Sequence, residues 1–187
     1  MGLFGVFGKK KASATQSGEA VKKDYGLVEI RTRSERWSED FLLMCETEDQ
    51  LPYAKKCLAF LDDLPADLEK RLAKYLWRYY KDYEDDYLIE FGEDAALTED
   101  QIFEHVEIGS LIVGNDCRQD RIEFHLDGNC DWEPEHGLEI TISDGAILYV
   151  GPYEDYEPNS ERLEYALEHF GFYDPDAYPI MNYADKE

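Results

Sequence analysis

Hydrophobic and polar positions in the first half of the chain follow a strand period and then a helix period. Residues 25–31 alternate between apolar and polar side chains, and residues 41–45 form a short apolar run, as β-strands do. Residues 49–61 then carry apolar side chains at helical spacing, and Pro65 begins a second stretch of the same kind. The pattern predicts two strands followed by a hairpin of two helices.

The second half of the chain returns to the strand period. Thr98 and Gln101 have the spacing of a capping box, which predicts a short helix from there to about His105. Asp144 and Gly145 predict a type I′ turn between two strands. The strands expected in this half are residues 106–113, 122–126, 138–142 and 146–150.

A last amphipathic helix is expected to begin at Asn159 or Ser160 and to end at Gly171. Residues 173–187, which contain two prolines, are expected to be irregular. Together the elements predict an α+β fold. In it, an antiparallel sheet, partly a meander, packs against a helical hairpin and a C-terminal helix.

Charge divides the chain near residue 23. The whole sequence has 43 acidic and 19 basic residues, a net charge of -24, but residues 1–23 contain five lysines and one glutamate. We therefore expect a flexible basic segment over residues 1–23 and a single acidic domain over residues 24–187. An acidic domain repels nucleic acids and anionic membranes, so the composition favours a basic protein as partner.

The cysteines and the lack of long apolar segments favour a location in the cytoplasm. Cys45, Cys57, Cys117 and Cys130 are far apart in the sequence and form no C-x-x-C pair, which favours free thiols in a reducing cytoplasm. No leader with an apolar core precedes them, and no apolar run is long enough to cross a bilayer. We expect a cytoplasmic protein without stable membrane association.

Motifs of enzymes and cofactor-binding proteins are missing from the sequence. It contains no G-x-S-x-G, no G-x-G-x-x-G and no Walker-type lysine. His125, Asp127, Cys130 and His136 do not have the spacing of a zinc module. The sequence therefore predicts a protein that is not an enzyme and that has no cofactor and no metal site.

Residues 127–133 leave calcium binding open as an alternative. Oxygen-bearing side chains at alternate positions are how a calcium loop begins. The segment then departs from that pattern, because Trp132 stands where the sharp turn needs glycine and Leu138 where a bidentate glutamate belongs. A turn-rich loop between two strands is the competing interpretation.

Tyrosines alternate with carboxylates in two segments, and these residues are candidate contacts for a basic protein. Tyrosine offers a large contact area at low entropic cost, and carboxylates pair with lysine and arginine. The alternative for the helical tyrosines is that they are packing residues. The candidate contacts are Tyr79, Tyr80, Tyr83, Asp85, Asp86, Tyr87, Tyr153, Glu154, Asp155 and Tyr156.

Residues 130–140 carry a resemblance to a known family. The stretch Trp-Glu-Pro-Glu-His-Gly-Leu, followed by a strand and a hairpin, resembles a bacterial domain family of unknown function with a W-x-x-E-H-G-L motif. Members of that family are similar to immunity proteins of polymorphic or contact-dependent toxin systems. The motif positions in this chain are Trp132, Glu135, His136, Gly137 and Leu138. The resemblance implies an architectural role for them and no catalytic one. Glu139 stands where the family often continues with glycine.

These observations predict a cytoplasmic acidic binding protein. The resemblance implies an immunity protein that neutralises a basic toxin, such as a nuclease, by occluding its active site. Two alternatives remain at this stage. One is an acidic regulatory protein or nucleic-acid mimic that binds a basic housekeeping factor, and the other is a calcium-binding protein.

Overall fold

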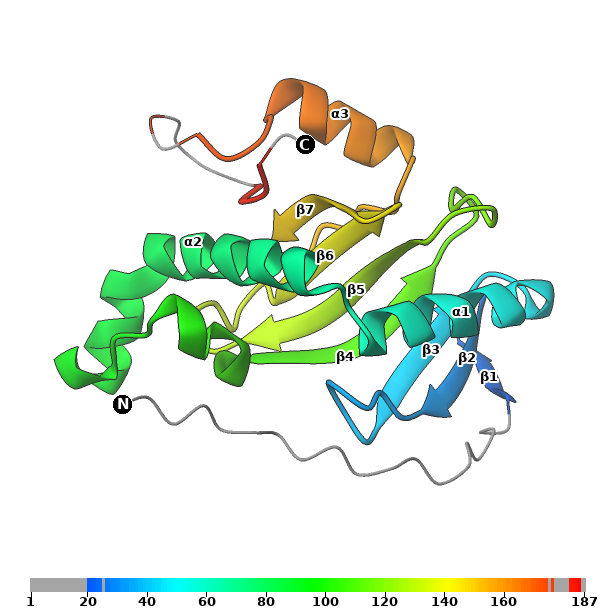
Figure 1. The fold of residues 1–187 in the computed structure, drawn as a ribbon, viewed down its shortest axis with the longest axis horizontal. Helices are drawn as coiled ribbons and strands as arrows, with labels where there is room; N and C mark the ends of the chain where they lie inside the picture. Colours follow the sequence, from blue (N-terminus) through cyan, green and yellow to red (C-terminus); the bar gives the residue numbers. More distant parts are fainter. Residues whose placement is uncertain (1–19, 25, 175, 177–181, 186–187) are drawn as a thin grey trace.

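The structure is a computed structural model of the chain, and it describes residues 20–24, 26–174, 176 and 182–185 (Figure 1). Within these residues it confirms the α+β class. Seven strands form one sheet in the order β1-β2-β3-β4-β5-β6-β7. The strands are β1 (Ala20–Asp24), β2 (Leu27–Thr32), β3 (Phe41–Cys45), β4 (Val106–Val113), β5 (Glu123–Cys130), β6 (Leu138–Ser143) and β7 (Ala146–Gly151). The helices are η1 (Glu48–Gln50), α1 (Leu51–Asp62), α2 (Ala66–Phe91), η2 (Glu93–Ala95), η3 (Glu99–His105) and α3 (Glu161–His169), where η denotes a 3₁₀ helix.

The sheet consists of two antiparallel meanders, β1–β3 and β4–β7, that meet at one parallel pair. Leu42 of β3 lies opposite Ser110 of β4, and Cys45 lies opposite Val113. The sequence predicted an antiparallel sheet, and the parallel β3–β4 pair is where the structure differs from that prediction. The chain leaves β3, passes through α1 and α2, and re-enters the sheet beside β3, and a crossover of this length produces a parallel neighbour.

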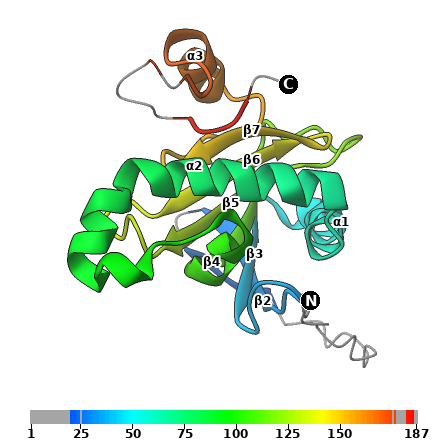
Figure 2. The ribbon, with the colours of Figure 1, turned by 60° about the vertical axis from the view of Figure 1, so that its left-hand side comes forward.

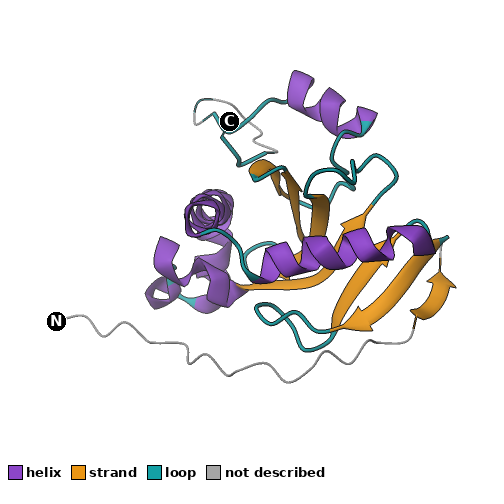
Figure 3. Ribbon diagram, turned by 45° about the vertical axis from the view of Figure 1, so that its right-hand side comes forward, coloured by secondary structure: helices purple, strands orange, loops and turns teal. Residues whose placement is uncertain are grey.

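Helices α1 and α2 cover the same face of the sheet but lie crosswise on it. In Figure 2 α1 is seen end-on while α2 runs across the view, and in Figure 3 much of α2 is seen end-on instead. Helix α1 contacts β3 and β4, whereas α2 contacts β7. The two helices are consecutive, as expected for a hairpin. They do not pack along each other, because each buries its apolar stripe on a different part of a twisted sheet.

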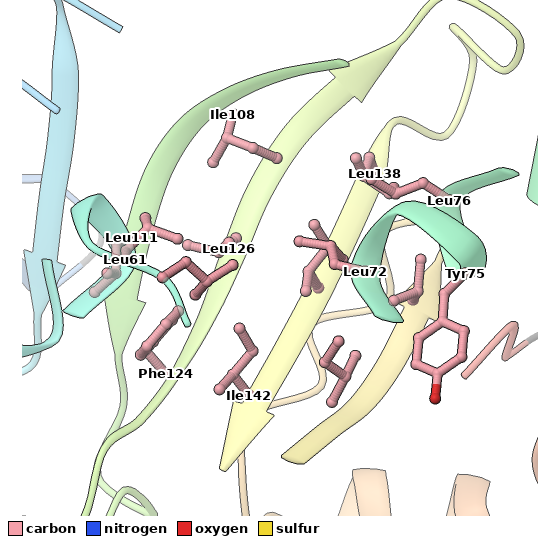
Figure 4. Close-up of a cluster of buried hydrophobic side chains, with 14 of the residues drawn as sticks. Leu61, Leu72, Tyr75, Leu76, Ile108, Leu111, Phe124, Leu126, Leu138 and Ile142 are labelled. Atoms are coloured by element: carbon pink, nitrogen blue, oxygen red, sulfur yellow. The ribbon is translucent and has the colours of Figure 1, made fainter. Parts of the chain in front are cut away.

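The main core lies between these helices and the sheet. Figure 4 shows Leu72 and Leu76 of α2 facing apolar side chains of the central strands, among them Leu138 and Ile142 of β6. All four side chains are fully buried. Leu72 and Leu76 belong to the apolar stripe that the sequence shows at helical spacing. The helix period therefore places them on the side of α2 that faces the sheet.

The opposite face of the central strands is polar and also buried. Glu123 and His125 of β5 and Glu139 and Thr141 of β6 are each 0% exposed. They alternate with apolar residues because successive side chains of a strand point to opposite faces. We call these four residues the buried polar layer.

Residues near both ends of the chain contribute to the sheet or contact it. Strand β1 begins at Ala20, so its first four residues belong to the stretch 1–23 for which the sequence predicted a flexible segment. Residues 1–19 lie outside the described residues. At the other end, Tyr183 donates its backbone N–H to the Val150 carbonyl at 2.9 Å, so that part of the tail covers the edge strand β7.

The structure contains no helix, among the residues it describes, that combines the length and the apolarity needed to span a membrane.

We expect Leu72→Ala to lower the free energy of unfolding by about 2–5 kcal/mol, because it removes a fully buried side chain and leaves a cavity. Urea denaturation followed by circular dichroism measures this change. The matched control is Ile89→Ala in the same helix. Ile89 is 84% exposed, so its truncation should alter stability by no more than about 0.5 kcal/mol. Equal losses in both variants would contradict this assignment of the core.

Candidate functional site

The tyrosines predicted as partner contacts on α2 are mainly core residues. Tyr79 and Tyr80 are fully buried and Tyr87 is 6% exposed, while Tyr83 is partly buried against the core. Their three- and four-residue spacing places them on the side of α2 that faces the domain. The packing alternative therefore describes them, and these tyrosines drop out of the contact surface.

Two of these tyrosines contact Trp132, and the other two contact those tyrosines. The five rings are called the aromatic cluster: Trp132, Tyr79, Tyr80, Tyr83 and Tyr87. The Trp132 ring lies 5.8 Å from Tyr79 and 6.0 Å from Tyr80 in edge-on arrangements. Tyr80 contacts Tyr87 at 5.6 Å in the same way. Such edge-to-face pairs are favourable beyond their burial.

Hydroxyl groups tie the aromatic cluster to the backbone. The Tyr79 hydroxyl donates to the Gly137 carbonyl at 3.3 Å. The Tyr80 hydroxyl accepts the N–H of Leu97 at 3.1 Å and donates to a Glu84 carboxylate oxygen at the same distance. The hydroxyls of Tyr79 and Tyr80 are thereby satisfied, and the second half of α2 is fixed to the motif and to the segment before η3.

The motif segment forms a tight turn between β5 and β6. Gly137 has φ +70°, and a Cβ atom there would lie 2.9 Å from the Gly128 carbonyl oxygen. Glu133, which the motif does not include, is buried and accepts hydrogen bonds from the backbone N–H and the ring Nδ1 of His136 at 2.8 and 2.9 Å. The hydrogen bond to Glu133 raises the pKa of His136.

Ligand atoms of Glu133, Glu135 and His136 lie within 4.8 Å of one another, the spacing that a divalent cation needs. The set considered from the sequence is not brought together in this way. His125 lies in the buried polar layer, whereas Cys130 is buried in the main core.

The segment 127–133 is not a calcium loop. Residues 127–130 are the end of β5, and Asp127 lies opposite Glu139 of β6. In a strand, alternate side chains point the same way along a straight line, so they do not converge on one ion as the turns of a calcium loop do. Residues 127–130 therefore do not have the loop geometry considered from the sequence.

The last turns of α2 form an exposed acidic end of the molecule, at one end of its long axis (Figure 1). Its five exposed residues are called the acidic end of α2: Asp85, Asp86, Ile89, Glu90 and Phe91. Ile89 is 84% exposed and Phe91 is 53% exposed. The stretch 82–100 contains nine carboxylates and no lysine or arginine. This surface combines apolar and acidic groups.

Phe91 is supported from beneath by the aromatic cluster. Its ring lies 4.7 Å from that of Tyr87, which in turn contacts Tyr80. Lys81, the nearest basic residue in the helix, pairs with Glu84. Within the described part of the chain, Asp85, Asp86 and Glu90 therefore keep their charges uncompensated.

The second predicted segment forms a strap, residues 152–159, over the buried polar layer. Tyr153 is 39% exposed and Asp155 is exposed, while Tyr156 is buried against Tyr149 at 4.8 Å. Glu154 pairs with Arg162 of α3 at 3.2 Å. Two of these four predicted contacts, Tyr153 and Asp155, thus lie at the surface.

Glu139 holds the strap in place. Its carboxylate accepts the backbone N–H groups of Glu154, Asp155 and Tyr156 at 2.7, 2.7 and 2.6 Å, and Asp155 has φ +59°. The Thr141 hydroxyl adds a bond to the Tyr156 carbonyl at 2.8 Å. Glu139 is therefore the anchor of the strap.

The far end of the strap is held in a similar way by Glu123. Its carboxylate accepts hydrogen bonds from the backbone N–H of Arg118 at 2.6 Å, from the Ser143 hydroxyl at 2.9 Å and from the Asn159 amide at 2.7 Å. Burial alone would raise the pKa of Glu123, but these hydrogen bonds lower it overall.

Burial favours the neutral forms of His125 and Glu139, the other titratable residues of the buried polar layer. Burial lowers the pKa of His125 to about 4, although Asp155 and the Tyr156 backbone act in the opposite direction. Burial raises the pKa of Glu139 to about 7. The sequence offered a signal for this layer, because polar residues at 123, 125, 139 and 141 share one face of two paired strands.

A hollow of about 300 Å³ opens between α2 and the β6–β7 turn. Phe60, Leu68, Arg71 and Ile122 are among its lining residues. None of the predicted site residues lines it, so it does not join the surfaces described above.

Comparison with known proteins places most of the chain in one family. The sequence model of a family described as "Domain of unknown function (DUF6985)" matches residues 19–157. No curated protein and no solved structure matches the chain.

His125 and Glu139 should give opposite pH dependences of stability. The pKa of Glu139 is raised in the fold, so its contribution is complete below about pH 4.5 and is lost as the pH rises through about 7. The pKa of His125 is lowered, so its contribution is complete above about pH 6.5 and is lost as the pH falls towards 4. Between these limits the two slopes offset each other.

We therefore expect the free energy of unfolding of Glu139→Gln to fall more steeply than that of the natural chain as the pH drops from about 6.5 to 4. The free energy of unfolding of His125→Phe should fall as the pH rises from about 4.5 to 7. Urea denaturation over this pH range measures both slopes, and the double variant should lose both. A slope of the same sign in the two single variants would refute the assignment.

Proposed function

The chain belongs to the DUF6985 family of domains of unknown function, and we propose that it is a cytoplasmic binding protein whose partner is a basic protein. The observation that carries the proposal is the acidic end of α2, where Ile89 is exposed by 84% beside uncompensated carboxylates. A large apolar side chain in that position is unfavourable in water unless a partner covers it.

The charges around Ile89 define the partner. Asp85 and Asp86 lie one turn before Ile89 on the same side of the helix, since residues three and four apart are neighbours. A basic surface would be drawn to them over the distance of a Debye length, about 8 Å at physiological salt. Carboxylates at the rim speed association with a basic partner. The apolar residue between them then slows dissociation of the complex.

The shape of the site favours a concave partner. Ile89 and Phe91 are two residues apart in a helix, so their side chains leave it about 200° apart. A flat surface reaches one of them, whereas a cleft that receives the helix end covers both. The geometry therefore supports insertion of the end of α2 into a basic cleft.

The aromatic cluster makes such insertion favourable. Because Tyr87 and Tyr80 pack against Trp132, the helix end is ordered before binding, and little conformational entropy is lost on association. The buried tyrosines thus support the contact surface from within instead of forming it.

The resemblance of the 132–138 motif to toxin-immunity proteins refines the proposal. A nuclease binds phosphate groups in a basic cleft, and carboxylates on an inserted helix end would replace those phosphates. We propose a basic toxin of this kind as the partner, with its active site occluded. The alternative partner is a basic housekeeping factor with a similar cleft. It would bind the same surface, the acidic end of α2.

We expect Ile89→Ser to accelerate dissociation of the partner by about 30-fold or more, because an apolar anchor worth about 2 kcal/mol is lost. The double reversal Asp85→Lys with Asp86→Lys should chiefly slow association, and its effect should shrink at high salt. A pull-down with the natural chain, washed at high salt, first identifies the basic protein that it retains. Surface plasmon resonance with that protein then measures both rates.

Tyr165→Ser is the matched control for these variants. Tyr165 is 57% exposed on α3, among acidic residues of a different surface. It should leave both rates within about twofold of those of the natural chain. A loss in Tyr165→Ser as large as that in Ile89→Ser would remove the acidic end of α2 as the binding surface.

A further inference from the structure

We propose that Glu133, Glu135 and His136, in the turn between β5 and β6, bind a divalent transition-metal ion such as zinc. These three residues are called the turn triad. The proposal does not involve the acidic end of α2, so it goes beyond the proposed function and can be tested without a partner. It departs from the expectation drawn from the sequence, where no ligand set has the spacing of a zinc module.

The turn triad brings one imidazole and two carboxylates together. Their ligand atoms all lie within 4.8 Å of one another, and a Glu133 carboxylate oxygen lies 2.9 Å from His136 Nδ1. A tetrahedral zinc ion with bonds of about 2.0–2.2 Å needs its ligand atoms about 3.4 Å apart. Small rotations of the two exposed side chains therefore suffice to complete the site.

Glu133 has the weakest charge compensation of the three glutamates that are buried in the described part of the chain. Glu123 pairs with Arg118 at 3.2 Å, and Glu139 accepts three backbone N–H groups. Glu133 is 5% exposed, and its partners among the described residues are the backbone N–H and a ring nitrogen of His136. Buried charges are usually paired with an opposite charge or coordinate a metal. A metal ion beside His136 would supply positive charge at this position.

The backbone of the turn is fixed on both sides of the ligands. Pro134 restricts the backbone between the two glutamates of the turn triad. The His136 carbonyl accepts the N–H of Tyr153 at 3.1 Å, and the Gly137 carbonyl accepts the Tyr79 hydroxyl at 3.3 Å. The ligands are therefore held close together before an ion binds, which lowers the entropic cost of binding.

The ligand types select the class of metal ion. An imidazole nitrogen beside carboxylate oxygens suits zinc and other first-row transition metals. Calcium and magnesium prefer sites made of oxygen atoms alone. Because one of the three ligands is an imidazole, we expect zinc to bind more tightly than calcium.

The site is open to solvent on one side. Glu135 and His136 are exposed, whereas Glu133 lies buried beneath them. An ion can therefore enter from water, and the net charge of -24 favours its approach. Three protein ligands leave a fourth position of a zinc ion for water or for an atom of a bound molecule. The turn would thus carry an electrophilic centre on an acidic surface.

Isothermal titration calorimetry of the full chain with zinc chloride tests the proposal at a salt concentration of about 0.15 M, where general attraction between ions is screened. We expect one zinc ion per chain, which an excess of calcium does not displace. His136→Gln and Glu135→Gln should each weaken binding by about 10- to 100-fold or more, since losing a ligand matters at least as much as losing a group that only orients one. Both side chains are exposed, so these variants keep the fold.

His105→Gln is the matched control. His105 Nδ1 lies 2.9 Å from an Asp131 carboxylate oxygen, the same separation as in the pair of His136 and Glu133. The pair of His105 and Asp131 belongs to no set of three ligands among the residues that the structure describes. The zinc affinity of His105→Gln should therefore equal that of the natural chain.

Nuclear magnetic resonance of the imidazole rings locates the ion directly. The chain has four histidines, so each ring can be assigned by substitution. The ring signals of His136 should shift and reach saturation at one equivalent of zinc chloride. Those of His105 and His169 should keep their positions.

Four results would overturn the proposal. The first is the absence of zinc binding by the natural chain. The second is weak binding of several zinc ions without dependence on His136, which is the behaviour of a general polyanion. The third is an equal loss of affinity in His105→Gln and His136→Gln. The fourth is displacement of zinc by calcium, which would assign the site to a hard cation.

Discussion

The edge-on packing of Trp132 against Tyr79 and Tyr80 is the contact on which the arrangement of this domain depends. It joins three parts that are distant in the sequence: the middle of α2, the turn between β5 and β6, and, through the Tyr80 hydroxyl, the segment leading to η3. Without it, the second half of α2 would extend beyond the sheet with little to pack on. With it, an exposed and charged helix end becomes a rigid projection.

The opposite face of the sheet is stabilised by hydrogen bonds to buried polar groups. Burying Glu123, His125, Glu139 and Thr141 together is unfavourable unless each group is neutral or hydrogen-bonded. Glu123 and Glu139 meet this condition by accepting N–H groups, largely from the strap and the loop before β5. A polar layer of this kind fixes one path for the strap, because only that path supplies the donors, and it explains why an irregular segment is held so closely.

The elements with strong local signals could be predicted from the sequence. The helix period of α1 and α2, the capping box at Thr98 and the turn at Asp144 each depend on residues close together in the chain, and each is present. The parallel β3–β4 pair and the crossing of the helices depend on how the two halves meet, which no local pattern encodes. The prediction that the tyrosines of α2 contact a partner failed for a related reason. A tyrosine beside an aspartate looks the same in sequence whether it packs against a tryptophan from β5–β6 or faces water. Polar alternation marked Glu139 as part of a polar strand face, but its contact with the strap had no local signal, since its donors lie 15 to 17 residues further along.

The parallel pair also has a consequence for how the chain folds. Each meander can form from contacts between sequence neighbours, which close short loops and are fast. Joining them brings Leu42 to Ser110, across α1, α2 and η3, and this closure loses far more chain entropy before any hydrogen bond forms. The β4–β7 meander with α2 is therefore a natural early folding unit. The docking of β3 onto it is the late, slow step in which the open edges of β3 and β4 are exposed to aggregation.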